Sequence, residues 1–132
     1  MAMNNFDVVY IDDEVCMTDI FSQFVKFKYQ HWRACAFNDS MDLYNKIVSN
    51  EISAKVWIVD VMMPGRNGTQ IAAALSEVVD PSTVVIGYTA LDHHTLESKP
   101  EYKTGLRCFS RIINKQENFS NLLDLVDVWV KK

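Results

Sequence analysis

Acidic side chains close two hydrophobic stretches of the sequence and a hydroxyl closes a third; the residues are Asp12 and Asp13, Asp60, and Thr89. Carboxylates held close together repel one another unless a cation joins them. Oxygen ligands without a nearby histidine or cysteine favour Mg²⁺, which takes one or two carboxylates together with water and phosphate oxygens. The pattern therefore predicts Mg²⁺ chemistry on a phosphoryl group, with the threonine and a lysine in contact with its oxygens.

Asp60 taken alone is open to several interpretations. A single aspartate after a strand is most often a helix N-cap, and it could also be a metal ligand or a nucleophile. A carboxylate nucleophile can accept a phosphoryl group and form an aspartyl-phosphate. The following turn suits a crowded site, because Pro64-Gly65 bends the chain tightly and Gly68 lets the backbone pass close by. Capping alone does not explain the whole acidic set.

The elements that must position these residues alternate along the chain. The predicted strands, rich in β-branched and aromatic residues, are 6–11, 33–37, 56–60, 83–88 and 107–113. The predicted helices are 14–30, 39–50, 67–79 and 117–132, and 91–105 is predicted to be a short helix followed by a loop, because Pro100 should stop it. Apolar strands separated by helices predict a parallel sheet covered on both faces, with its site at the carboxyl ends of the strands.

Composition limits the domain count and the partners. The chain has 132 residues, of which 48% are hydrophobic, which fits one domain over 1–132 with 1–5 as a short N-terminal tail. Its formal charge of −4 argues against direct binding to nucleic acid and favours a neutral or basic protein partner. Neither a membrane span nor a signal peptide is evident, so we expect a cytoplasmic protein.

The ordered set of motifs resembles the receiver domains of two-component response regulators. The matching features are Asp12-Asp13 after a hydrophobic strand, Asp60 followed by "VMMPGRNG" (the family's D-x-x-M-P-x-x-x-G), and "YTA" at 88–90. The resemblance covers essentially the whole chain. It implies a flavodoxin-like, doubly wound α/β fold with a five-stranded parallel sheet of order 2-1-3-4-5 and helices on both faces.

The resemblance also implies a role for each residue of the site. Asp60 would be the phosphoacceptor. Asp13, Asp60 and the backbone carbonyl of Met62 would ligate Mg²⁺, and Asp12 would help through a water molecule. Thr89 would swing toward the phosphoryl group, and an aromatic residue on the last strand would be its rotameric partner. Phe109 is the best candidate for that aromatic residue.

The family's Lys-Pro pair after the fifth strand is missing, so the position of the site lysine is open. Lys115 fits if 97–104 contains an insertion, and this choice aligns the apolar stripe of the last helix. Without a gap, Ile112 occupies the lysine position, and Arg111 or Lys115 would have to substitute from nearby.

The implied partners are those of a signalling module and not those of a conventional enzyme. A histidine kinase or phosphotransfer protein would supply the phosphoryl group, and a downstream protein or an output domain would read the change. The chain could also form a homodimer through its fourth helix, fifth strand and fifth helix. A degenerate receiver that binds partners without phosphorylation is an alternative. A Mg²⁺-dependent phosphatase of the haloacid dehalogenase type is another, although it needs an acid where this chain has Met62.

Overall fold

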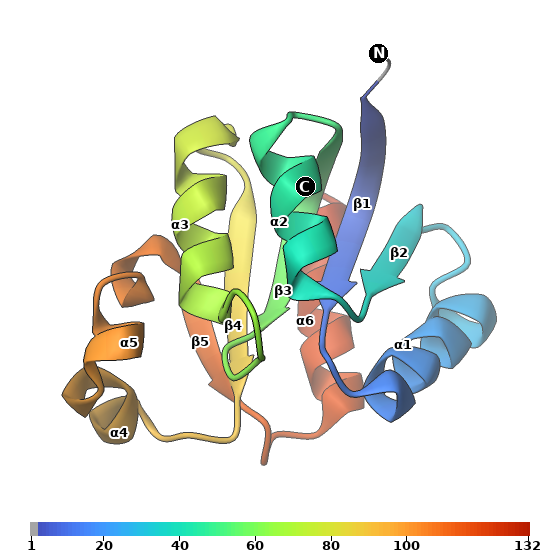
Figure 1. Cartoon of the computed structure of the whole chain (residues 1–132). Coiled ribbons are helices and arrows are strands. Elements are labelled where there is room, and N and C mark those ends of the chain that lie inside the picture. The colour runs from blue at the N-terminus through green and yellow to red at the C-terminus, as the bar shows by residue number, and fades with distance from the viewer. Residues whose placement is uncertain (1–2) are drawn as a thin grey trace.

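A computed structural model describes residues 3–132 and contains one five-stranded parallel sheet of order β2-β1-β3-β4-β5 (Figure 1). The strands are β1 (Asn4–Ile11), β2 (Ala34–Phe37), β3 (Ile52–Asp60), β4 (Val84–Thr89) and β5 (Arg111–Asn114). The α-helices are α1 (Val15–Lys28), α2 (Ser40–Val48), α3 (Gly68–Val78), α4 (His93–Ser98), α5 (Pro100–Lys103) and α6 (Phe119–Val130), and η1 (Leu106–Cys108) is a 3₁₀ turn. The predicted fold class and strand order are confirmed.

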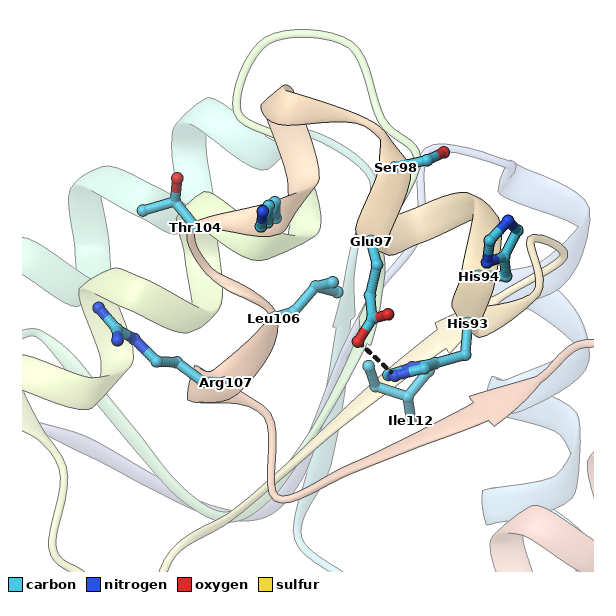
Figure 2. Close-up of a pocket in the computed structure, with 9 residues that line it drawn as sticks. His93, His94, Glu97, Ser98, Thr104, Leu106, Arg107 and Ile112 are labelled. Atoms are coloured by element: carbon cyan, nitrogen blue, oxygen red, sulfur yellow. Dashed lines mark ion pairs between the residues drawn. The ribbon is translucent and has the colours of Figure 1, made fainter.

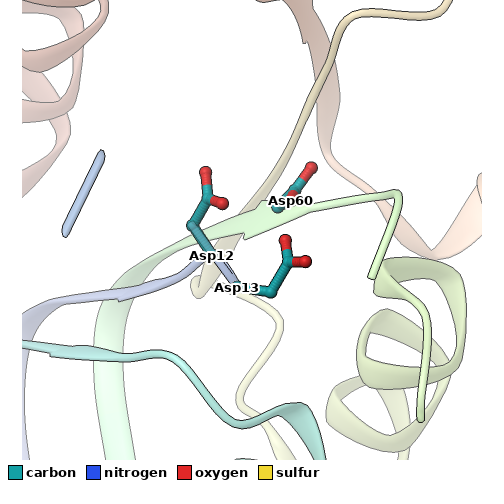
Figure 3. A group of neighbouring side chains, drawn as sticks. All are labelled: Asp12, Asp13 and Asp60. Atoms are coloured by element: carbon teal, nitrogen blue, oxygen red, sulfur yellow. The ribbon is translucent and has the colours of Figure 1, made fainter. Parts of the chain in front are cut away.

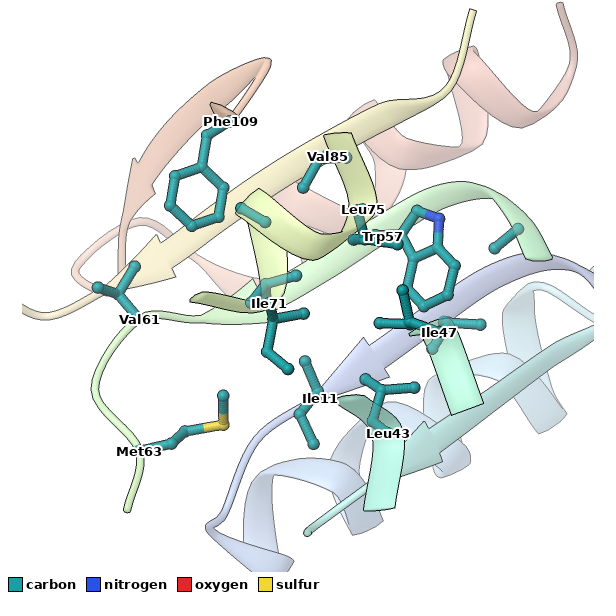
Figure 4. Close-up of a cluster of buried hydrophobic side chains, with 14 of the residues drawn as sticks. Ile11, Leu43, Ile47, Trp57, Val61, Met63, Ile71, Leu75, Val85 and Phe109 are labelled. Carbon is teal, nitrogen blue, oxygen red and sulfur yellow. The ribbon is translucent and has the colours of Figure 1, made fainter. Parts of the chain in front are cut away.

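Two hydrophobic clusters hold the helices against the sheet. Strand residues alternate between the faces, so that Trp57 of β3 joins one cluster and its neighbour Ile58 joins the other. The first cluster packs α2 and α3 against the sheet, and Figure 4 shows Ile47 and Leu75 beside Trp57. The second packs α1 and α6 on the opposite face. Burial on both faces explains why the strands are apolar along most of their length.

The predicted elements differ from the structure mainly between α4 and β5. Helix α4 ends before Pro100 as expected, but the predicted loop contains the short helix α5 and the turn η1. The strand predicted over 107–113 begins only at Arg111, so Phe109 lies before β5 and not on it. At the other end of the chain β1 begins at Asn4, inside the expected tail.

Contacts with α3 explain why β5 begins late. The Asn67 side chain donates a hydrogen bond to the Glu101 carbonyl at 3.1 Å. A Cβ atom on Gly105 would lie 2.6 Å from the Cβ of Thr69, so only glycine allows this close approach. The chain is therefore held against the start of α3 before it can enter the sheet. Over residues 3–132, no helix combines the length and apolar character needed to cross a membrane.

The start of α3 is built against the end of β3. Asn67 caps the helix in a reciprocal capping box with Gln70. A Cβ on Gly68 would lie 2.6 Å from the Cα of Val61, directly after Asp60. Gly68 is therefore required so that the helix can begin beside the carboxyl end of β3.

Candidate functional site

Three carboxylates converge at the carboxyl ends of β1 and β3 (Figure 3). Ile11 pairs with Val59, so Asp12 and Asp60 follow at the same level of adjacent strands. Oxygen atoms of Asp12, Asp13 and Asp60 lie within 4.8 Å of one another. Asp12 and Asp60 are buried, whereas Asp13 is exposed. The site therefore has a buried floor of two carboxylates and one carboxylate open to solvent.

Asp12 is held in place by hydrogen bonds from residues that were not predicted to contribute to the site. The Tyr10 hydroxyl donates a hydrogen bond to Oδ2 of Asp12 at 2.6 Å, and the Glu14 amide donates to Oδ1 at 3.0 Å. Asn38, which follows β2, donates to the Asp12 carbonyl at 2.9 Å. The two-residue period of β1 could have revealed Tyr10, because it places Tyr10 and Asp12 on the same side. Nothing in the local sequence pattern indicated Asn38.

Lys115 brings the nearest positive charge to the buried pair. Its Nζ atom lies 3.2 Å from Oδ2 of Asp12 and 3.3 Å from Oδ1 of Asp60. Its backbone amide donates to the Thr89 carbonyl at 2.7 Å, which anchors the lysine at the end of β4. Of the two positions considered from the sequence, Lys115 is at the carboxylates and Ile112 lies within β5.

The residue opposite Gly87 on β5 is Ile112. The Phe109 ring also covers Gly87, since a Cβ atom there would lie 3.2 Å from ring carbons, but Phe109 reaches it from the segment before the strand. The expectation of an aromatic residue on the last strand is therefore wrong for Phe109. The strand predicted over 107–113 included residues of the turn η1, which are not part of β5.

Thr89 and Met62 complete the surroundings of Asp60. Thr89 ends β4 next to Tyr88, the residue that pairs with Asp60, and its side chain is buried. Its Oγ1 accepts a hydrogen bond from the Leu91 amide at 3.1 Å. Met62 is 45% exposed. An apolar residue that is open to solvent therefore follows Asp60 by two positions.

The electrostatics of the site are unbalanced toward negative charge. Burial raises the pKa of Asp60 to about 8, repulsion from Asp12 adds to this rise, and Lys115 opposes it. Burial works to lower the pKa of Lys115, but attraction to Asp60 and Asp12 is stronger and the net direction is upward. One lysine thus faces two buried carboxylates and a third nearby. A further cation would relieve the repulsion.

The donor set can hold a metal ion. All three groups offer carboxylate oxygens, and no histidine or cysteine joins the acid cluster found within residues 3–132. Such ligands select hard cations over zinc or copper. Asp13 keeps the cluster open to solvent, so bound water could complete the coordination.

Comparison with known proteins agrees with this geometry. The family model described as the response regulator receiver domain matches residues 8–127. No curated protein matches the chain significantly.

Several solved structures share the fold over nearly the whole length. The BeF3-activated receiver domain of DrrB, a protein of Thermotoga maritima, is 23% identical with a TM-score of 0.74, and the match covers 99% of this chain and 100% of that one. The receiver domain of the Francisella response regulator 1452 is 22% identical with a TM-score of 0.71, over 96% and 98%. Thermotoga maritima TrrA, solved with Mg(2+)-BeF, is 18% identical with a TM-score of 0.69, over 96% and 99%.

Proposed function

The chain belongs to the response regulator receiver domain family, and from that premise we propose that Asp60 is the residue that accepts the phosphoryl group. Receiver domains are regulatory phosphoacceptors served by histidine kinases, and they are not conventional enzymes. The observation that carries the proposal is the position of Lys115 Nζ, 3.2 Å from Asp12 and 3.3 Å from Asp60. A buried acid pair with an adjacent lysine suits a group that must receive a negatively charged ligand.

The transfer forms one bond and breaks another. An Asp60 carboxylate oxygen attacks the phosphorus of a phosphohistidine on the kinase or phosphotransfer protein. The P–N bond breaks, its electron pair stays on the imidazole nitrogen, and that nitrogen then takes a proton. The acyl phosphate adds negative charge beside Asp12, so Lys115 is the residue placed to contact the new oxygens.

We assign the metal ion as Mg²⁺, held by Asp13, Asp60 and the backbone carbonyl of Met62, with Asp12 acting through water. The ion would neutralise phosphoryl charge during transfer. Asp12 is itself held by Tyr10 and Lys115, so it is oriented before any ion arrives. This preorganisation favours binding at a defined geometry.

Thr89 is the proposed link between the phosphoryl group and the rest of the domain. Its buried hydroxyl lies at the end of β4 and can donate a hydrogen bond while its oxygen accepts one from Leu91. Ile112 has no polar group and no ring that could exchange between two sites. We therefore propose that Thr89 and Lys115, and not an aromatic rotamer, carry the response to β4 and β5.

Intact mass after incubation with acetyl phosphate and Mg²⁺ tests the function. We expect a gain of one phosphoryl group that is lost in Asp60→Asn and retained in Asp19→Asn, an exposed acid of α1. Equal labelling of the parent and Asp60→Asn proteins would place the acceptor elsewhere. No labelling of the parent would favour a domain that acts without phosphorylation.

Met62 should influence the lifetime of the phosphoryl group. Its thioether cannot orient an attacking water, so we expect the Met62→Asn variant to lose the group faster than the parent. The decay of the phosphorylated mass after removal of the donor gives the rate. Unchanged decay would show that position 62 does not contribute to the hydrolysis step, without affecting the assignment of Asp60.

A further inference from the structure

The free edge of β5 lies between two hollows that meet at Ile112. The first has a volume of about 890 Å³ and lies among α4, the 103–107 segment and Ile112 (Figure 2). The second, of about 350 Å³, lies between β5 and α6, and Leu122 and Leu125 line it. Leu106 of the first hollow packs with the cluster of α2 and α3, and Leu122 of the second packs with the cluster of α1 and α6, so the two hollows flank the edge strand on opposite faces of the sheet.

Backbone groups of Ile112 point toward this edge. The Lys115 amide donates to the Thr89 carbonyl, and the residues of β5 pair in register with β4 up to Asn114. Successive residues of a parallel strand direct their backbone groups alternately toward one neighbour and the other. Lys115 faces β4, so by this alternation Ile113 and Arg111 also face β4. The N–H and C=O of Ile112 therefore face outward. Within residues 3–132, no backbone hydrogen bond outside the regular elements involves Ile112.

The side chains on β5 show what an added strand would meet. Ile112 packs with the cluster that includes α3, and Ile113 packs with the cluster that includes α6. An extended segment paired with β5 would have the same alternation. One side chain would enter the hollow beside α4, and the next would enter the hollow beside α6.

The hollow beside α4 carries basic groups in an otherwise acidic protein. Its rim includes His93, His94, Lys103 and Arg107, and its one acid, Glu97, pairs with His93 at 2.9 Å. The floor is formed by Leu106 and Ile112. With histidine counted as neutral the chain has a formal charge of −4, whereas this rim has two positive side chains, Lys103 and Arg107, against the one negative side chain Glu97. Charge complementarity favours an acidic side chain here, whereas Leu122 and Leu125 favour an apolar one on the other face.

We propose that the edge of β5 binds an extended segment of a partner protein, which joins the sheet as a sixth strand and alternates acidic with apolar side chains. Backbone pairing with Ile112 gives the binding, and the two hollows give the selectivity. The four residues of β5 limit the paired segment to about four to six residues. The inference does not depend on phosphorylation of Asp60.

A labelled peptide of alternating valine and glutamate residues is a direct probe. Two forms of this peptide, each N-methylated at every second residue, differ only in which set of amides is blocked. Fluorescence anisotropy with the full chain should show binding of the unmethylated peptide and of one methylated form, with at least tenfold weaker binding of the other. Equal affinity of the two methylated forms, or no binding of any form, would overturn strand addition.

Charge reversal tests the basic rim. We expect Lys103→Glu and Arg107→Glu each to weaken peptide binding about three- to tenfold. Lys26→Glu in α1 makes the same charge change as Lys103→Glu outside the groove and should have little effect. If Lys26→Glu weakened binding as much as Lys103→Glu, only net charge would matter and the proposed groove would be wrong.

Amide hydrogen exchange followed by NMR locates the bound peptide. Exchange at Ile112 should slow when the peptide is added, with a smaller change at Ile113, whose amide already faces β4. Unchanged exchange at Ile112 would contradict the proposal. Sedimentation of the chain without peptide tests whether a second copy of the chain occupies this edge instead. Self-association that is abolished by Arg107→Glu would assign the edge of β5 to a second copy and overturn the proposal of a partner segment.

Discussion

Two groups of aspartates lie at opposite ends of the sheet. The difference between their surroundings distinguishes a candidate ligand-binding site from a contact that only stabilises the fold. Asp12 and Asp60 share the cation Lys115, and Asp13 lies beside them without an ion pair in the part of the chain that the structure describes. Asp124 and Asp127 of α6 instead have several hydrogen-bond donors and cations around them, from the end of α1, from the residues that follow α1, and from Lys131 at the end of α6. Helix α1 connects the two ends, since it begins directly after the first group and ends beside the second.

The α6 aspartates are fully satisfied within the fold. Asp127 accepts hydrogen bonds from Trp32 at 2.8 Å and His31 at 2.7 Å, and Lys131 lies 3.0 Å away. Burial of the Asp127 carboxyl works to raise its pKa, but these donors are stronger and lower the pKa to about 2. The pKa of Asp60 moves the opposite way, to about 8. A carboxylate with enough donors stabilises the fold, whereas one with too few is prepared for a ligand.

The largest expected effect is on the stability of the metal-free protein when Asp60 is neutralised. The folded-state pKa near 8 exceeds the ordinary value of 3.8, so the stability that neutral Asp60 contributes is fully present below about pH 4 and is lost as the pH rises through about 8. At pH 8.5, roughly, Asp60→Asn should be more stable than the parent by a few kcal/mol. Urea denaturation at several pH values measures this.

Two further measurements sharpen the result for Asp60. The parent and Asp60→Asn curves should converge near pH 4, where the parent carboxyl is protonated. Mg²⁺ should stabilise the parent at high pH much more than it stabilises Asp60→Asn. A pH-independent difference between the two proteins would mean that the charge of Asp60 is not the cause.

Removal of the lysine should have the next largest effect. In Lys115→Met the two buried carboxylates lose their cation, although Asp60 can relieve part of the repulsion by taking a proton. We expect a loss of about 2 kcal/mol in the free energy of unfolding at neutral pH, measured with chelator present. The double variant Lys115→Met/Asp60→Asn should recover much of this loss. Additive effects of the two substitutions would show that the residues do not interact.

Asp127→Ala should destabilise the protein by about 2 kcal/mol at pH 7, because Trp32 and His31 lose their acceptor. The depressed pKa makes the sign opposite to that of Asp60: the contribution is present above about pH 4 and is lost as the pH falls through about 2. Thermal unfolding of the variant and the parent between pH 2 and 7, roughly, would reveal this dependence. A difference that grew as the pH fell would contradict the assignment.

The smallest effect is expected at Asp124. It pairs with Lys28 at 2.9 Å and accepts a hydrogen bond from Tyr29, but its side chain is 53% exposed. Asp124→Ala should therefore be less harmful than Asp127→Ala, and added salt should shrink the difference from the parent. A larger loss at Asp124 than at Asp127 in the same denaturation experiment would reverse the proposed order.

Local sequence patterns were sufficient to predict the parallel α/β architecture and the positions of the acidic residues of the site. The apolar strands and helical periods predict the parallel sheet, and its order followed from the family resemblance. Asp12, Asp60 and Thr89 could be placed at one edge because each directly follows or ends a recognisable strand. These predictions depend on short-range periodicity, which a single sequence displays.

Only the tertiary structure decided where Lys115 and Phe109 lie and which residues satisfy the α6 aspartates. The alignment of β5 depends on the path of residues 100–108, and that path is set by contacts of Glu101 and Gly105 with the start of α3. The hydrogen bond of Trp32 to Asp127 joins residues 95 positions apart. Such contacts depend on how the packed elements meet in space, and no local period of the sequence records them.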